Sequence, residues 1–185
     1  MGKIEDLAEV YKRHISLPWQ TTISGAQRII MVGYDKEQER TLRARKNAFE
    51  NATKEAGHKW FEVDITDAFA SWIAVDDYRE AYFEAPEDLR LKLEAEFSQH
   101  VADQISALLT RSEVDASSVV AVLGTGSLFG FARVSEVLKL IEHKIKGRLV
   151  VFFPGQIEDN NYRLLDARDG WNYMAIPISL HGGGA

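Results

Sequence analysis

The sequence predicts an α/β fold, with an open, mainly parallel sheet of about five strands and helices on both faces. Short apolar runs, which are typical of buried strands, recur along the chain. Segments with helical periodicity separate these runs. Because strands that alternate with helices pair in parallel through right-handed crossovers, this order predicts a layered sheet rather than a barrel or a helical bundle.

The first third of the chain predicts a helix, a strand and a second, longer helix. An amphipathic helix is expected from Ile4 to about Ile15, and residues 28–34 (RIIMVGY) form the first predicted strand. Asp35 follows at an N-cap position, with Gln38 three residues later as in a capping box. One long polar helix is then expected from about Lys36 to Ala56.

The rest of the chain continues the alternation. Further strands are expected at residues 59–65, 118–123, 148–153 and 173–178. Pro86 begins a helix whose apolar residues, from Leu89 to Leu108, recur every three or four positions, and another helix spans about Phe131 to Lys144. We expect one α/β domain over residues 1–180, followed by a flexible tail at residues 181–185.

Composition limits the classes of function. There is no cysteine, which excludes disulfides and thiolate chemistry, and no apolar run has the length of a signal peptide or membrane span. A cytoplasmic protein is therefore expected. The net charge of −6 predicts only weak or indirect DNA binding. One basic stretch, with acids intermixed, is the alternative DNA contact: Arg40, Arg43, Arg45 and Lys46.

No catalytic constellation is recognisable, so the sequence predicts a non-enzyme without a metal or cofactor. The five histidines lack ligand spacing. Asp35 and Asp64 follow strands, but neither has the partner acids of a two-metal site.

A glycine-rich turn after the third strand leaves two interpretations open. Gly124, Gly126, Ser127 and Gly130 stand where open α/β sheets hold phosphates, but the G-x-G-x-x-x-G spacing fits neither the Rossmann nor the P-loop pattern. The turn is either a structural one, or the remnant of a P-loop-like or Rossmann-like regulatory site that senses a ligand.

The segment from Pro154 to Tyr173 combines aromatic residues, asparagines and arginines. Exposed Tyr, Trp and Arg dominate protein interfaces, so this segment is the predicted partner-binding surface. Its candidate contacts are Asn160, Asn161, Tyr162, Arg163, Arg168 and Trp171. The alternative is an internal brace that contributes to the fold.

The same segment, FFPGQIEDNNYRLLDARDGWNYMAIPI, resembles the BrxB family, small subunits of type I BREX bacteriophage-defence systems. The resemblance extends upstream through VVAVLGTGSLFGFARVSEVL, GAQRIIMVGYDKEQERTLRARKNAFENATKEAGHKW and YKRHISLPWQ, and so covers nearly the whole chain. The resemblance implies a role in phage resistance beside the phosphatase-like protein PglZ, the ATPase BrxC and the methyltransferase PglX. It supplies no catalytic residues. Together with the lack of a recognisable catalytic constellation, the resemblance predicts an adapter that docks PglZ and/or BrxC.

Overall fold

The computed structural model describes residues 2–158, 161–165, 167–170 and 173–180, with the main chain alone at residues 167, 168 and 170. The described strands are β1 (Ile29–Tyr34), β2 (Lys59–Asp64), β3 (Ser118–Leu123), β4 (Arg148–Glu158), β5 (Asn161–Leu164), β6 (Ala167–Gly170) and β7 (Ile176–Ile178). The α-helices are α1 (Lys3–Ile15), α2 (Glu39–Arg45), α3 (Asn47–Glu55), α4 (Ala68–Ala74), α5 (Arg79–Glu84), α6 (Pro86–Lys92), α7 (Ser98–Leu109) and α8 (Val134–Ile141). A π-helical segment, Leu93–Phe97, joins α6 to α7.

Five strands form an open parallel sheet in the order β2-β3-β4-β1-β7, which confirms the predicted fold class. The central strands β1 and β3 are buried along their whole length, as their apolar sequences predict. β2, at one edge, is half-buried from Trp60 to Val63 and exposed at its two ends, Lys59 and Asp64. Beyond the sheet, β4 continues into an antiparallel hairpin with β5 and β6.

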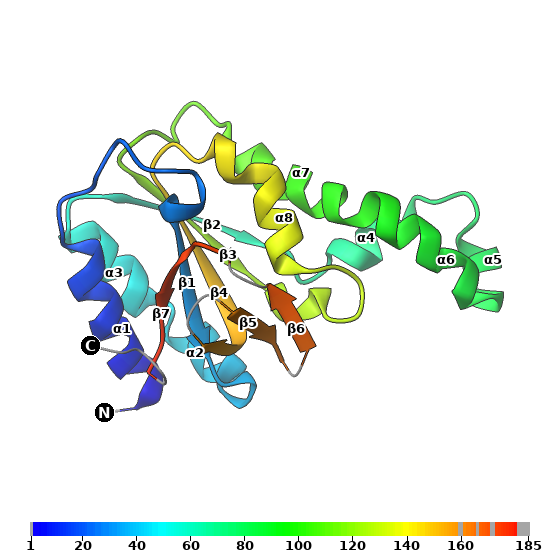
Figure 1. The fold of residues 1–185 in the computed structure, drawn as a ribbon, viewed down its shortest axis with the longest axis horizontal. Helices are drawn as coiled ribbons and strands as arrows, with labels where there is room; N and C mark the ends of the chain where they lie inside the picture. Colours follow the sequence, from blue (N-terminus) through cyan, green and yellow to red (C-terminus); the bar gives the residue numbers. More distant parts are fainter. Residues whose placement is uncertain (1, 159–160, 166, 171–172, 181–185) are drawn as a thin grey trace.

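Helices cover both faces, and alternate residues of each strand enter two separate cores. On one face α1 and α3 pack on the sheet: Tyr11 of α1 contacts Phe49 of α3, which in turn contacts Phe152 of β4. On the other face α7 and α8 pack against the side that carries Val151 and Phe153. Figure 1 shows these two layers on either side of the sheet.

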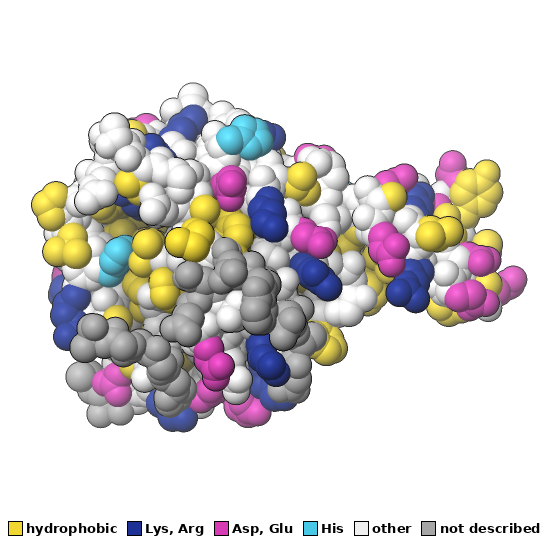
Figure 2. All heavy atoms as spheres, in the orientation of Figure 1, with side chains coloured by type: hydrophobic (Ala, Val, Ile, Leu, Met, Phe, Trp, Pro, Cys, Tyr) yellow, Lys and Arg dark blue, Asp and Glu magenta, His cyan; other side chains and the backbone are white. Residues whose placement is uncertain are grey.

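The helices α5 and α6 extend away from the sheet. Figure 1 shows α6 and α7 in line, so that α6 and α5 project far beyond the body of the molecule. The space-filling view in Figure 2 shows the same projection as a narrow extension of the rounded body. Among the described residues, no helix is long and apolar enough to span a membrane.

The predicted helix from Lys36 to Ala56 is wrong in its continuity, because the structure divides it into a 3-10 turn, α2 and α3. Lys46 lies between α2 and α3 and forms an ion pair with Glu62 of β2. The expected capping box is also absent. Asp35 makes no capping hydrogen bond, and its carboxylate instead accepts one from Lys3 Nζ at 3.2 Å.

Candidate functional site at the carboxyl edge of the sheet

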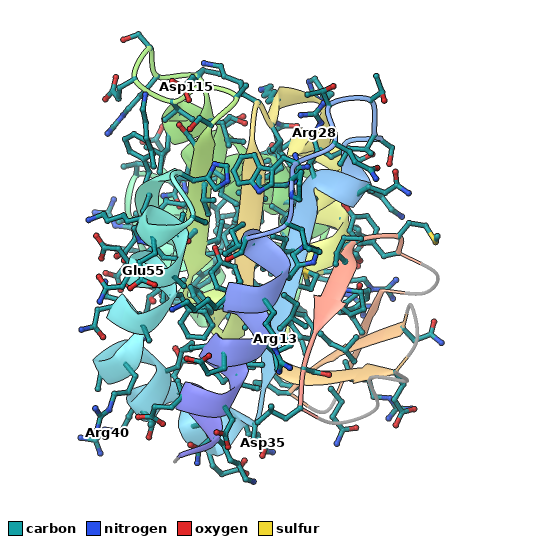
Figure 3. All side chains as sticks on the ribbon, turned by 90° about the vertical axis from the view of Figure 1, so that its left-hand side faces the viewer. Arg13, Arg28, Asp35, Arg40, Glu55 and Asp115 are labelled. Atoms are coloured by element: carbon teal, nitrogen blue, oxygen red, sulfur yellow. The ribbon has the colours of Figure 1, made fainter. Side chains whose placement is uncertain are left out.

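Parallel pairing brings the carboxyl ends of β1 to β4 to one edge of the sheet, where α/β folds bind ligands. Figure 3 shows Asp35 and Arg40 at this edge, and Arg28 and Asp115 at the opposite one. A groove of about 530 Å³ lies at the carboxyl edge. It is lined by Lys36, Glu39, Arg43, Asp64, Thr66, Asp67, Gly124, Gly126, Ser127, Pro154 and Leu165.

The glycine-rich turn contributes three of its four candidate residues to this groove. Gly124, Gly126 and Ser127 line it, whereas Gly130 lines a separate groove of about 520 Å³ beside α8. After Gly124 the chain forms a 3-10 turn over Thr125–Leu128, and α8 does not begin until Val134. No α-helix N-terminus therefore follows directly on the turn, although phosphate-binding loops rely on one.

The hydroxyl groups of the turn are occupied within the protein. Thr125 is buried, and its Oγ1 donates to the carbonyl of Phe152 at 2.7 Å. Ser127 Oγ lies 2.7 Å from the carbonyl of Gly124 and 3.2 Å from that of Ile65. Both side chains therefore join loops at the strand ends together, a structural role for the turn.

Gly124 also permits a close approach between two loops. Its φ is +86°, in the left-handed region that favours glycine. A Cβ at this position would lie 2.6 Å from both Asp64 Oδ1 and the Thr66 nitrogen. The turn therefore fits directly against the carboxylate that ends β2.

That carboxylate belongs to a charge network centred on Arg43. The guanidinium donates to Glu39 Oε1 at 2.9 Å, to Asp64 Oδ2 at 2.8 Å and to Thr66 Oγ1 at 2.9 Å. Tyr34 donates its hydroxyl to the other oxygen of Glu39. Helix spacing predicts the Glu39–Arg43 pair, but sequence reasoning missed the network because Asp64 lies 21 residues from Arg43.

The pKa values show which protonation states the network favours. Burial alone would raise the pKa of Asp64, but hydrogen bonds from Arg43 and Thr66 outweigh it and lower the pKa to about 2. The hydrogen bond to Asp64 raises the pKa of Arg43. Burial, followed by the bond to Glu39, raises the pKa of Tyr34. Asp64 therefore stays ionised and paired near neutral pH, unlike a general acid or base, whose pKa lies near the working pH.

The charges that line the groove do not favour an anion. Lys36 and Arg43 are outnumbered by Glu39, Asp64 and Asp67, and Arg43 is already bonded to two of these acids. Within the described part of the chain, no group of three or more His, Cys, Asp or Glu side chains is placed to hold a metal ion.

The predicted partner-binding segment forms the hairpin of β4, β5 and β6. Tyr162 is only 1% exposed and lies edge-on to Phe153 and Tyr173, so its expected exposure is wrong. Side chains of a strand alternate between faces, and the strand β5 that turns Tyr162 inward turns Arg163 outward. Asn161 is half-buried.

The other candidates in this segment are only partly described. Arg168 pairs through its main chain with Arg163 in the hairpin. Its side chain, together with Asn160 and Trp171, lies outside the described residues, as does the tail at 181–185.

Sequence reasoning missed Asp169, which is 5% exposed and caps α8. Its carboxylate accepts hydrogen bonds from the Val134 nitrogen at 2.6 Å and the Ser135 nitrogen at 2.7 Å. Ser135 Oγ donates to its carbonyl at 2.9 Å. A local capping pattern could not reveal this contact, because donor and acceptor are 34 or 35 residues apart.

Comparison with known proteins gives a family but no close relative. No curated protein and no solved structure matches the chain. A family model described as "BREX protein BrxB" matches residues 62–178, more than half of the chain. The match extends from β2 through the helical projection, the glycine-rich turn and the β4–β6 hairpin to β7. The chain therefore belongs to the BrxB family of BREX proteins.

Proposed function

We propose that this protein is a non-catalytic adapter of a BREX phage-defence complex, which acts in the cytoplasm and docks the phosphatase-like protein PglZ and/or the ATPase BrxC. Membership of the BrxB family makes it a component of phage defence. The observation that carries the adapter role is the Arg43 network, in which the protein's own side chains pair with one another at the edge where α/β enzymes bind substrates. PglX joins the wider complex.

The outward side of the β5–β6 hairpin is the proposed docking surface. Arg163 is exposed there, and arginine is enriched in interface hot spots. Asn161 lies two positions before it in β5. Asn160, Arg168 and Trp171 are proposed as further contacts from the sequence alone. Tyr162 supports this surface from the core rather than contacting the partner.

The alternative is a regulatory domain that senses a nucleotide at the glycine-rich turn. Gly124, Gly126 and Ser127 do line one groove, which is the observation in its favour. The occupied hydroxyl of Ser127 and the acidic lining count against it. Calorimetry with ATP separates the two proposals. The adapter proposal expects no micromolar binding, whereas binding that Gly126→Asp abolishes would establish the nucleotide site.

Pull-down of purified PglZ and BrxC by the tagged protein tests the docking surface. Arg163→Ala should weaken binding about thirtyfold, since an interfacial arginine contributes about 2 kcal/mol or more. Its thermal melt should not change. Arg13→Ala, an exposed arginine on α1, is the matched control and should bind normally.

Tyr162→Ala gives the opposite signature. The side chain is buried, so its removal should lower the free energy of unfolding by about 3–5 kcal/mol. The molecules that remain folded should keep their affinity. If the unmodified protein retains neither PglZ nor BrxC, the adapter proposal fails.

A further inference from the structure

The projecting helices form a second candidate surface, distinct from the hairpin. We call residues 75–96, which include α5, α6 and most of the π-helical segment, the arm. In Figure 1 α5 and α6 lie at the far end of the molecule, beyond the end of α7 and away from the sheet.

The arm exposes large apolar side chains. Val75 is 81% exposed, Tyr78 69%, Phe83 65% and Leu91 76%. The inward face of α6 packs against the protein through Leu89, which is buried. Single exposed hydrophobics are ordinary, but four in one short projection mark an interaction site.

The arm also carries most of the protein's net negative charge. Its 22 residues include eight acids and three bases, a net charge of −5 out of −6 for the whole chain. Five of the acids are exposed and form no ion pair with the described residues: Asp77, Glu80, Glu84, Glu87 and Asp88. Figure 2 shows acidic side chains around the hydrophobic ones at the end of the projection.

The arm is held at its base. Lys92 forms an ion pair with Asp76 and lies 5.8 Å from the centre of the Trp72 ring. Phe97, at the end of the π-helical segment, is fully buried between Phe69 and Trp72. The projection is therefore anchored to the body while its outer surface remains uncovered.

We infer that the arm docks into an apolar groove, bordered by lysine and arginine residues, on a partner protein. The inference rests on the proposed adapter function and assigns it a second surface. Apolar side chains ringed by unpaired acids are complementary to such a groove, and the same charge repels nucleic acid.

The N-terminal part of a second copy of this chain is a poor match for the acidic arm. Over α1 to β2, seven basic residues are already paired with acids of the same molecule: Lys3, Lys12, Arg43, Arg45, Lys46, Lys54 and Lys59. These seven residues therefore offer little free positive charge to the arm of a second copy.

Affinity measurements on whole protein with purified PglZ and with purified BrxC test the arm. The double variant Phe83→Ser/Leu91→Ser should bind one of them at least tenfold more weakly, with an unchanged melt because both side chains are exposed. Leu17→Ser, at a residue that is 60% exposed outside the arm, is the matched control and should bind normally.

The charge component has its own variant. Glu80→Gln/Glu84→Gln/Glu87→Gln should weaken binding at low salt, and the difference from the unmodified protein should shrink as salt screens the charges. A photo-crosslinking residue at position 91 should attach to a partner peptide next to lysines or arginines.

Each other outcome overturns the inference. If the unmodified protein binds PglZ or BrxC and both arm variants bind it as tightly as the unmodified protein does, the arm inference fails and the adapter proposal stands. Crosslinking to a second copy, or to a partner surface without basic residues, also overturns it. If the unmodified protein binds neither component, the adapter proposal fails and the arm inference fails with it.

Discussion

Gly124 links the conformation of one residue to the geometry of the candidate site. Its left-handed φ and the short distance to Asp64 both exclude a side chain. Gly57 shares the first property only. Its φ is +87°, but a Cβ there would meet nothing within 4 Å. The two glycines therefore separate backbone strain from steric conflict.

Gly57→Ala should lower the free energy of unfolding by about 1–2 kcal/mol, the cost of a left-handed alanine. Gly124→Ala should cost more, because the new methyl group also displaces Asp64 and Thr66. Thermal melts measure the difference, at roughly 2–4 °C for each kcal/mol in a chain of this size. Equal losses at the two positions would show that Asp64 does not pack against the turn.

The lowered pKa of Asp64 predicts a pH dependence of stability. A carboxyl whose pKa is about 2 in the folded protein, below its ordinary value of 3.8, stabilises the fold above pH 4. This stabilisation is lost as the pH falls from about 4 to 2. Denaturation curves of Asp64→Asn should lack that component, whereas Asp67→Asn, which makes the same change in net charge, should retain it.

At the scale of elements, the hairpin and α8 depend on each other through Asp169. The strand β6 places this carboxylate at the N-terminus of α8, where two main-chain N–H groups need an acceptor. Within the segment from Pro154 to Tyr173, Asp169 therefore holds the start of α8. The outward side of β5 remains the proposed docking surface.

Asp169→Ala should destabilise the protein by at least about 1–2 kcal/mol, because it leaves two buried donors without an acceptor. Asp169→Asn keeps one oxygen and should fall in between. The control is Asp67→Ala, since Asp67 precedes α4 but makes no capping hydrogen bond. Chemical denaturation measures all three. A loss no larger than that of the control would mean that the cap contributes nothing.

At the scale of the whole molecule, negative charge is concentrated in the arm, and the basic stretch is neutralised. Arg43 pairs with Asp64, Arg45 with Glu5 at 3.3 Å, and Lys46 with Glu62, so three of its four cations already have acidic partners. Arg40 alone leaves little for a phosphate backbone to contact.

The isolated protein should therefore bind DNA only weakly, and this binding should vanish at physiological salt. Fluorescence anisotropy with a labelled duplex measures it over a range of salt concentrations. Nanomolar, sequence-selective binding at about 150 mM salt would contradict this charge distribution.

The sequence by itself determined the fold class and the position of most elements. Alternating apolar runs and amphipathic segments predicted the five parallel strands, and the predicted boundaries of β1, β2 and β3 agree with the structure to within about one residue. These elements are predictable because the spacing of apolar residues within each segment is a local property of the sequence. The BrxB resemblance, read from the same residues, was confirmed by the family match.

Only the tertiary structure decided how separate elements meet. The extension of β4 into a hairpin buried Tyr162, the Arg43 network joined α2 to the end of β2, and Asp169 reached α8. The projection of the arm likewise depends on where α6 leaves the core. Each of these features joins residues far apart in the chain, and periodicity records the face of an element but not the neighbour that covers it.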